Sequence, residues 1–262
     1  MSMLSLVVDQ PHLAARLNEV TSLIELLTDD AETALVLDLL KRANCYSGEE
    51  NMRAATNVAE CIAANWSLMP ANTWLVARDI EEKASSADAA LQLVRMCLTR
   101  VNATWASSNF LSTMDTLTAL PENSNVVLID DFIGTGRKVS EKVEWIRRNT
   151  HVRSIFIATF HSQQQAADTL TPIVDGYFSS ITTRKGISDA FDETMAAELR
   201  DLMKRIEIRF GKISAKMSLG YRGSESLYFQ LMWNTPNNVF PIFWTSQHQF
   251  DGSFRPILIR NR

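Results

Sequence analysis

The stretch from Asn125 to Ser140, NVVLIDDFIGTGRKVS, constrains the fold more than any other part of this chain. It opens with four consecutive apolar residues, 126–129. A short apolar run bounded by polar residues is typical of a strand buried on both faces of a parallel sheet. Two carboxylates, Asp130 and Asp131, follow where the strand should leave the sheet, and a helical pattern covers about 137–148. This order predicts an α/β fold with ligand groups at the carboxyl end of a strand.

The turn between the carboxylates and the helix has the composition of an anion-binding site. Gly134 and Gly136 allow backbone conformations that β-carbons forbid, and amides at a helix N-terminus can cradle an anion. Thr135 adds a hydroxyl donor, while Arg137 and Lys138 add positive charge. Carboxylates accept hydrogen bonds only, so the preceding acid pair suits sugar hydroxyls or the water shell of Mg²⁺.

Together these groups predict a ribose-phosphate site, and the alternative is an ordinary buried strand followed by a capped helix. Two rival motifs fail on spacing. A phosphate-binding P-loop would need Gly at Asp131 and Lys at Arg137, and a DxDxT motif would need Asp at Phe132.

Length and composition set wider bounds. The 262 residues form one domain or two small ones, and 46% apolar and 21% charged residues are typical of a globular protein. A net charge of −4 argues against general affinity for nucleic acid. The three cysteines and four histidines are scattered without a metal-binding pattern. The first residues lack the features of a signal peptide, and no apolar run approaches the roughly 18 residues of a membrane span, so we expect a cytoplasmic protein.

The remaining pattern predicts two regions. Residues 10–66 have helical spacing throughout, so 1–70 is expected to be a helical cap or docking region, with Thr28 or Asp29 capping a second helix. Residues 71–262 are expected to form an α/β domain that includes a β-containing tail, 217–262. The other strands of this domain are predicted at 73–77, 153–160 and 176–181, and its other helices at 88–101 and 188–210.

Three further features have two interpretations each. His161, at the carboxyl end of a predicted strand, is either a core residue or a ligand group. The basic residues of the helix 188–210 form either a solvated face with i,i+4 pairs or a surface for a partner or nucleic acid. The tail has a predicted strand at 227–233 and a predicted strand or extended segment at 239–244, and its aromatic residues either stack on a flat base or form a hydrophobic lid.

The segment VVLIDDFIGTGRK resembles the phosphoribosyl-pyrophosphate (PRPP) motif of type I phosphoribosyltransferases. The resemblance implies a parallel sheet flanked by helices, a homodimer, and a closing loop over about 103–124. It also implies that Asp130 and Asp131 bind the ribose hydroxyls, and that 134–138 bind the 5′-phosphate. One residue departs from the family, because Lys138 stands where Thr or Ser is usual. The loop after the strand 73–77 would hold the pyrophosphate, through Arg78, Lys83, Ser85 and Ser86, although Ser85 or Ser86 could be a plain helix cap.

With the tail NTPNNVFPIFW included, the chain resembles the PRTase-CE family of bacterial conflict systems over about residues 30–250. Members are proposed effectors in anti-phage loci, some of them beside retron reverse transcriptases. The resemblance therefore implies a toxin-like effector, held in check by a partner such as a reverse transcriptase–nucleic acid complex.

These observations lead to one main functional hypothesis and one alternative. The main hypothesis is a phosphoribosyltransferase-like enzyme that binds PRPP or a related nucleotide with Mg²⁺ and transfers or cleaves at ribose C1. Its catalysis would come from positioning and electrostatics rather than from an attacking side chain. The alternative is a catalytically inactive nucleotide sensor or scaffold that binds a partner complex.

Overall fold

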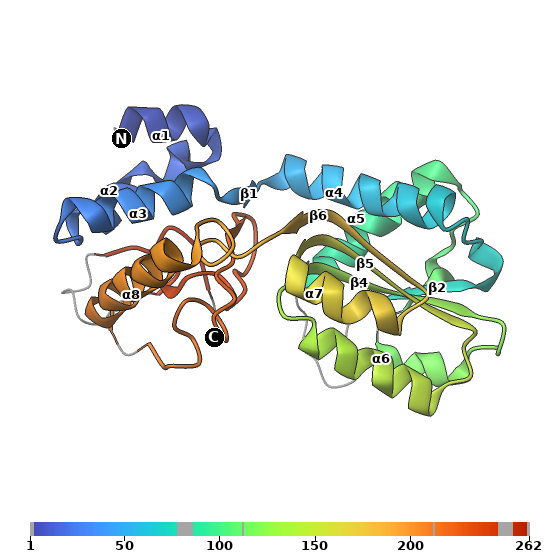
Figure 1. Cartoon of the computed structure of the whole chain (residues 1–262). Helices are drawn as coiled ribbons and strands as arrows, with labels where there is room; N and C mark the ends of the chain where they lie inside the picture. Colours follow the sequence, from blue (N-terminus) through green and yellow to red (C-terminus); the bar gives the residue numbers. More distant parts are fainter. Residues whose placement is uncertain (1–2, 78–85, 112, 212, 246–253, 261–262) are drawn as a thin grey trace. The chain divides into compact units, whose positions relative to one another are not determined.

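The structure, a computed structural model, describes residues 3–77, 86–111, 113–211, 213–245 and 254–260. The chain forms two units: unit 1 comprises Met1–Ser47 and Arg184–Arg262, and unit 2 comprises Gly48–Thr183 (Figure 1). This division differs from the predicted boundary after residue 70. The reason is that helix α4 (Gly48–Glu60) packs on helix α5 (Ser86–Val101) and on the strands of unit 2, and so belongs with the sheet.

Unit 2 is built on a sheet of five parallel strands, which confirms the predicted α/β class. The strand order is β3-β2-β4-β5-β6. The strands are β2 (Thr73–Val76), β3 (Phe110–Leu111), β4 (Asn125–Ile133), β5 (Ser154–Gln163) and β6 (Gly176–Thr183). The apolar run at 126–129 forms the middle of β4 and is buried, as its composition predicts.

Helices cover both faces of this sheet. α4 and α5 lie on one face, and α6 (Arg137–Asn149) and α7 (Gln164–Leu170) lie on the other (Figure 1). The apolar stripe of α6, made by Val139, Val143 and Ile146, packs in one cluster with Val126 and Leu128 of β4. The predicted helical segments 88–101 and 137–148 therefore agree with the structure to within about two residues.

Unit 1 contains the helices α1 (Met3–Asp9), α2 (Leu17–Glu25), α3 (Asp30–Lys41) and α8 (Glu193–Arg209). Its two-stranded parallel sheet joins β1 (Asn44–Tyr46) to β7 (Tyr228–Gln230). The prediction that residues 10–66 are wholly helical was therefore wrong at β1. The partner of β1 is far away in the sequence, so local periodicity could not reveal it. Shorter 3₁₀ segments lie at Pro11–Arg16, Pro70–Asn72, Ser107–Asn109, Met114–Ala119, Thr171–Ile173 and Pro241–Phe243, with a π-helical turn at Cys61–Asn65.

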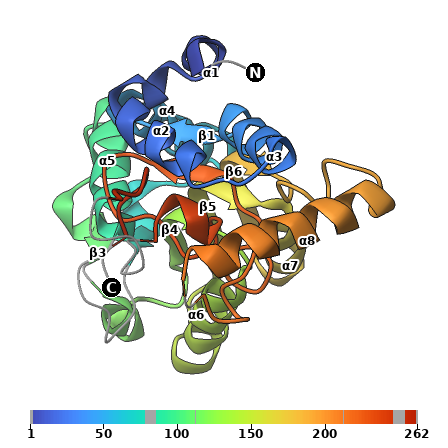
Figure 2. The same ribbon diagram turned by 90° about the vertical axis from the view of Figure 1, so that its left-hand side faces the viewer.

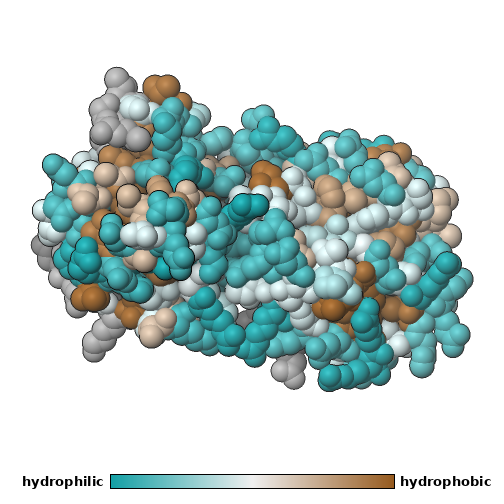
Figure 3. Space-filling model, in the orientation of Figure 1, coloured by the Kyte–Doolittle hydropathy of each residue, from teal (hydrophilic) through white to brown (hydrophobic). Residues whose placement is uncertain are grey.

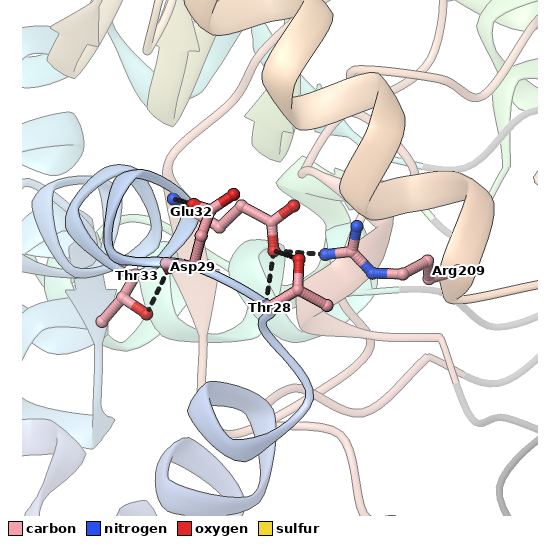
Figure 4. A network of polar contacts seen from close by, with 5 residues as sticks. All are labelled: Thr28, Asp29, Glu32, Thr33 and Arg209. Atoms are coloured by element: carbon pink, nitrogen blue, oxygen red, sulfur yellow. Dashed lines mark hydrogen bonds and ion pairs between the residues drawn. The ribbon is translucent and has the colours of Figure 1, made fainter.

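Helices α3 and α8 lie side by side in Figures 1 and 2 and are joined by a buried carboxylate. Asp29 caps α3 by accepting a hydrogen bond from the Glu32 amide at 2.8 Å. The Glu32 side chain accepts from the Thr28 amide at 2.8 Å and forms an ion pair with Arg209 of α8 (Figure 4). Burial alone would raise the pKa of Glu32, but the hydrogen bonds from Arg209 and Thr28 outweigh it and lower that pKa. Arg209 thus has a structural partner within unit 1.

Three phenylalanines of the tail lie in the core of unit 1, which agrees with a packing role for them rather than base stacking. Phe229, Phe240 and Phe243 are fully buried, and the ring of Phe243 lies 4.9 Å from Phe229 and 6.3 Å from Phe240 between centroids. The predicted strand at 239–244 is instead a 3₁₀ helix that begins at Pro241. Proline cannot donate to a strand ladder but suits the first position of a helical turn.

The face shown in Figure 3 is hydrophilic over most of its area, and apolar residues are scattered on it. Among the helices that the structure describes, none combines the length and hydropathy that a membrane crossing requires.

Two glycines of unit 1 with left-handed backbones allow a matched stability test. Gly220 has φ +80°, and a β-carbon there would overlap the carbonyl oxygen of Asn238. Gly223 has φ +66°, but a β-carbon there would meet nothing within 4 Å. Both alanine variants carry the left-handed penalty of roughly 1–2 kcal/mol. We expect Gly220→Ala to lose about 1–3 kcal/mol more than Gly223→Ala, because only the former also overpacks.

The measurement is the urea unfolding midpoint of the full chain, with unfolding monitored by circular dichroism. Equal midpoints for the two variants would contradict the close approach of Gly220 to Asn238.

Candidate functional site

The acid pair lies at the point where the order of the strands in the sheet reverses, between β2 and β4. The strand that follows β2 in the sequence, β3, lies on one side of β2, and β4 lies on the other. The helix after β2, α5, covers one face of the sheet, whereas the helix after β4, α6, covers the opposite face. The helices that follow β2 and β4 therefore lie on opposite faces of the sheet, and the carboxyl ends of two such strands are the position at which open α/β sheets bind ligands.

Asp130 and Asp131 differ in exposure although they are adjacent. Asp130 is half-buried, and Asp131 is 3% exposed. The Asp131 amide donates to Oδ1 of Asp130 at 2.9 Å. Burial, and then the neighbouring Asp131 charge, raise the pKa of Asp130 to about 7, while Lys142 and Lys138 act in the opposite direction. Asp130 therefore changes its charge near neutral pH, and such shifted carboxylates are frequent at functional sites.

The glycine turn fits closely against the next helical layer. Gly136 precedes the 13-residue helix α6 and has φ +75°. A β-carbon on Gly136 would lie 3.3 Å from Leu170 Cγ and 3.4 Å from Ala166 Cα, so glycine lets the turn approach α7. Ser140 closes the first helical turn by donating to the Gly136 carbonyl from its amide at 2.8 Å and its hydroxyl at 3.1 Å.

The predicted phosphate-binding cations begin α6. Arg137 and Lys138 are exposed there, and Arg137 donates to Glu141 at 3.0 Å. Both side chains of this pair are more than half exposed, and such pairs contribute little, so a phosphate could displace the carboxylate. Thr135 is half-buried between the two glycines. The structure thus brings residues 130–138 together in one strand–turn–helix unit.

A buried lysine, Lys142, was missed at the sequence level. It is 6% exposed and donates from Nζ to the carbonyl oxygen of Ala77, at the end of β2, at 2.7 Å. Its spacing gave the signal: Lys142 lies three residues after Val139 and four before Ile146, on the apolar face of α6. Lysine is seldom buried without a partner, and no other buried lysine or arginine occurs in the part of the chain that the structure describes.

The predicted pyrophosphate loop is seen only in part. Arg78, Lys83 and Ser85 lie outside the described residues. Ser86 is the first residue of α5 and is half-buried. The segment expected to close over the site contains the edge strand β3 and two 3₁₀ turns; Asn109, in the first of these turns, donates to the Thr73 carbonyl at 2.8 Å.

His161 is a core residue, in agreement with the first of its two interpretations. It is fully buried in β5, opposite Phe132 of β4, and its Nε2 lies 2.8 Å from Thr183 Oγ1. Burial lowers its pKa to about 3, so the ring is neutral at physiological pH. A second missed residue, Tyr177 of β6, lies near the acids: burial raises its pKa to about 12, and the charge of Asp130 adds to that shift.

The fold and this site define a phosphoribosyltransferase-like α/β protein. The sequence matches the PRTase-CE family over residues 27–260, so the chain belongs to that family. No relative was found among curated proteins.

Several solved structures are similar in part. A hypothetical protein from Neisseria gonorrhoeae with bound ppGpp has 14% identity and a TM-score of 0.37, covering 60% of this chain and 96% of its own. Orotate phosphoribosyltransferase from Aeropyrum pernix has 14% identity and a TM-score of 0.33, covering 59% and 75%. HGPRT-ase from Leishmania tarentolae in complex with GMP has 15% identity and a TM-score of 0.34, covering 52% and 78%.

The raised pKa of Asp130 predicts how stability varies with pH. Between its ordinary value of 3.8 and about 7, the folded state retains a proton that the unfolded state has lost, so stability falls as pH rises through this window. Asp130→Asn removes the charge. We expect this variant to gain about 1–2 kcal/mol relative to wild type on going from pH 5 to pH 8.5, a value reduced for partial exposure.

Thermal unfolding in the presence of a chelator measures this difference. Asp168→Asn, an exposed change on α7, serves as the control and should show no such dependence. A constant difference between Asp130→Asn and wild type across the pH range would contradict the prediction.

Proposed function

We propose that unit 2 binds PRPP or a related ribose-phosphate nucleotide at the carboxyl ends of β2 and β4, and that it transfers or cleaves at ribose C1. The observation that carries the proposal is one continuous unit at the switch point of the sheet: a central strand, an acid pair, a glycine turn and a helix N-terminus. Membership of the PRTase-CE family supports it.

Each part of the ligand has a matching group. The ribose hydroxyls donate to the carboxylates of Asp130 and Asp131, which can only accept. The 5′-phosphate lies on the turn 134–136 at the start of α6, where backbone amides and the helix dipole favour an anion. Arg137 and Lys138 add charge, and the lysine replaces the usual hydroxyl. The assignment of the pyrophosphate to Arg78, Lys83, Ser85 and Ser86 stays a prediction.

The reaction needs no attacking side chain. The bond between C1 and the pyrophosphate oxygen breaks, and its electron pair leaves with the pyrophosphate. The ribose then carries oxocarbenium character, and an acceptor supplies the electron pair of the new bond to C1 and releases a proton. The protein contributes position and charge. Water as the acceptor gives hydrolysis, and a base or nucleotide gives glycosyl transfer.

Mg²⁺ accompanies PRPP in the resembled enzymes, but the described residues do not fit a resident Mg²⁺ site. They offer two adjacent carboxylates with the ammonium of Lys142 nearby, and no group of three or more His, Cys, Asp or Glu side chains able to hold a metal occurs among them. Mg²⁺ takes six oxygen ligands and keeps several waters. A water-mediated contact of Asp130 and Asp131 with Mg²⁺ carried by the ligand stays a prediction, and no step here depends on it.

The biological role belongs to the same proposal. A toxin-like effector in defence against phage, restrained by a protein or a reverse transcriptase–nucleic acid complex, is what PRTase-CE membership favours. One observation favours the alternative of an inactive sensor or scaffold: Lys138 stands where the resembled family usually has a hydroxyl.

Ligand binding is tested first by thermal unfolding of wild type, Asp130→Asn/Asp131→Asn and Asp168→Asn, with and without PRPP and Mg²⁺. A ligand at a hundred times its dissociation constant should stabilise wild type and the Asp168 control by about 2.7 kcal/mol. The double variant should lose this gain. No gain in wild type, with other ribose phosphates also tried, would contradict the proposed site.

Turnover separates the enzyme from the sensor. With PRPP, Mg²⁺ and a pool of bases and nucleotides, wild type should release pyrophosphate, and Asp131→Asn should lower the rate by about 10²-fold or more, because the acid positions the ribose in the transition state. If PRPP binds to wild type but no pyrophosphate appears, the sensor is the correct assignment.

A further inference from the structure

The side chain of Lys142 is a buried cation at the proposed site that no motif explains. A buried ammonium is costly unless it is paired and hydrogen-bonded. Lys142 donates one hydrogen bond from Nζ to the Ala77 carbonyl oxygen at 2.7 Å. This carbonyl group is a neutral partner. The charge of Lys142 therefore needs a further compensating group close by.

The register of the sheet identifies that group. Val76 of β2 pairs with Leu128 of β4, so Ala77 lies one residue, and Asp130 two residues, beyond the same pair. Lys142 reaches the end of β2 from α6, and its positive charge acts on Asp130. The two carboxylates and this ammonium thus gather at neighbouring strand ends. Lys138, by contrast, is exposed at the first turn of the same helix.

A fixed cation changes what two adjacent carboxylates can bind. Alone, a close carboxylate pair concentrates negative charge and attracts a divalent cation. An ammonium held nearby by the helix cancels part of that charge and repels a second cation. It leaves the carboxylate oxygens able to accept hydrogen bonds from neutral donors such as hydroxyl groups.

We propose that Lys142 is the built-in counter-charge of the Asp130–Asp131 pair and takes the place of a protein-bound divalent cation there. The acid pair is thereby kept for hydroxyl donors. If the ligand is PRPP, an identity that rests on the function proposed above, any Mg²⁺ enters the site bound to the pyrophosphate of that ligand.

The experiment compares Lys142→Met with Arg148→Met. Both remove one positive charge from α6, but Arg148 is exposed and is paired with Glu144 at 3.0 Å. Thermal midpoints are measured during a titration with Mg²⁺ alone, at constant ionic strength. Wild type and Arg148→Met should respond weakly. Lys142→Met should start lower and rise with Mg²⁺, with a half-saturating concentration at least roughly tenfold below that of wild type, the size of effect one adjacent charge has on ionisation.

A further change to Asp131→Asn in the Lys142→Met background should abolish the gained response. If Lys142→Met responds to Mg²⁺ as weakly as wild type, Lys142 is only an anchor for β2 and the proposal is wrong. If Lys142→Met does not fold, the double variant Asp130→Asn/Lys142→Met is tested for recovery of folding, and this result decides between the two roles of Lys142. Removing one carboxylate restores folding when Lys142 balances charge, and it fails to do so when the bond to Ala77 alone matters.

This test does not depend on the ribose-phosphate proposal, because Mg²⁺ is the only probe. A wild-type protein that does not bind PRPP would overturn the proposed function and leave the counter-charge result intact. If wild type binds PRPP but Lys142→Met gains no response to Mg²⁺, the counter-charge proposal is wrong and the proposed function stands.

Discussion

The pairing of β4 with both β2 and β5 is the constraint on which the rest of unit 2 depends. β4 has a neighbour on each side and a helical layer on each face, so its apolar residues are excluded from water over most of their length. Its two carboxylates, Asp130 and Asp131, lie beyond Leu128, the last residue of β4 that pairs with β2, while the pairing with β5 continues to Ile133. The position of the site is therefore a result of burial as much as of chemistry.

Local patterns predicted this part of the chain well. The apolar run, the acids and the glycine turn are consecutive in sequence, and α6 has a clear period, so strand, turn and helix could each be recognised from neighbouring residues. The sheet class followed because such buried strands alternate with helices. Lys142 could have been found by the same periodicity, since its position lies on the buried face of α6, but a charged residue there is easily assigned to the solvent side.

Unit 1 could not be predicted in the same way, because its contacts join distant parts of the chain. β1 acquires its partner β7 only in the tail, and Glu32 is neutralised by Arg209 across 177 residues. The rings of Phe229, Phe240 and Phe243 could be assigned to stacking or to a core from sequence alone, and only tertiary packing decides between these. For the same reason the boundary after residue 70 was misplaced: composition marks the end of the helical block but not the surface on which α4 packs.

The discontinuity of unit 1 also sets an order for folding during synthesis. Unit 2 is one continuous segment, Gly48–Thr183, whereas unit 1 needs β7 and the aromatic core that follows it. Domains generally fold as units while the chain grows at roughly 5–20 residues per second, so the segments of unit 1 beyond residue 183 emerge several seconds later. The sheet that carries the acid pair can thus form while the first 47 residues still lack their partners. A nascent chain would present the proposed ribose-phosphate site before the unit formed by the flanking parts of the sequence exists.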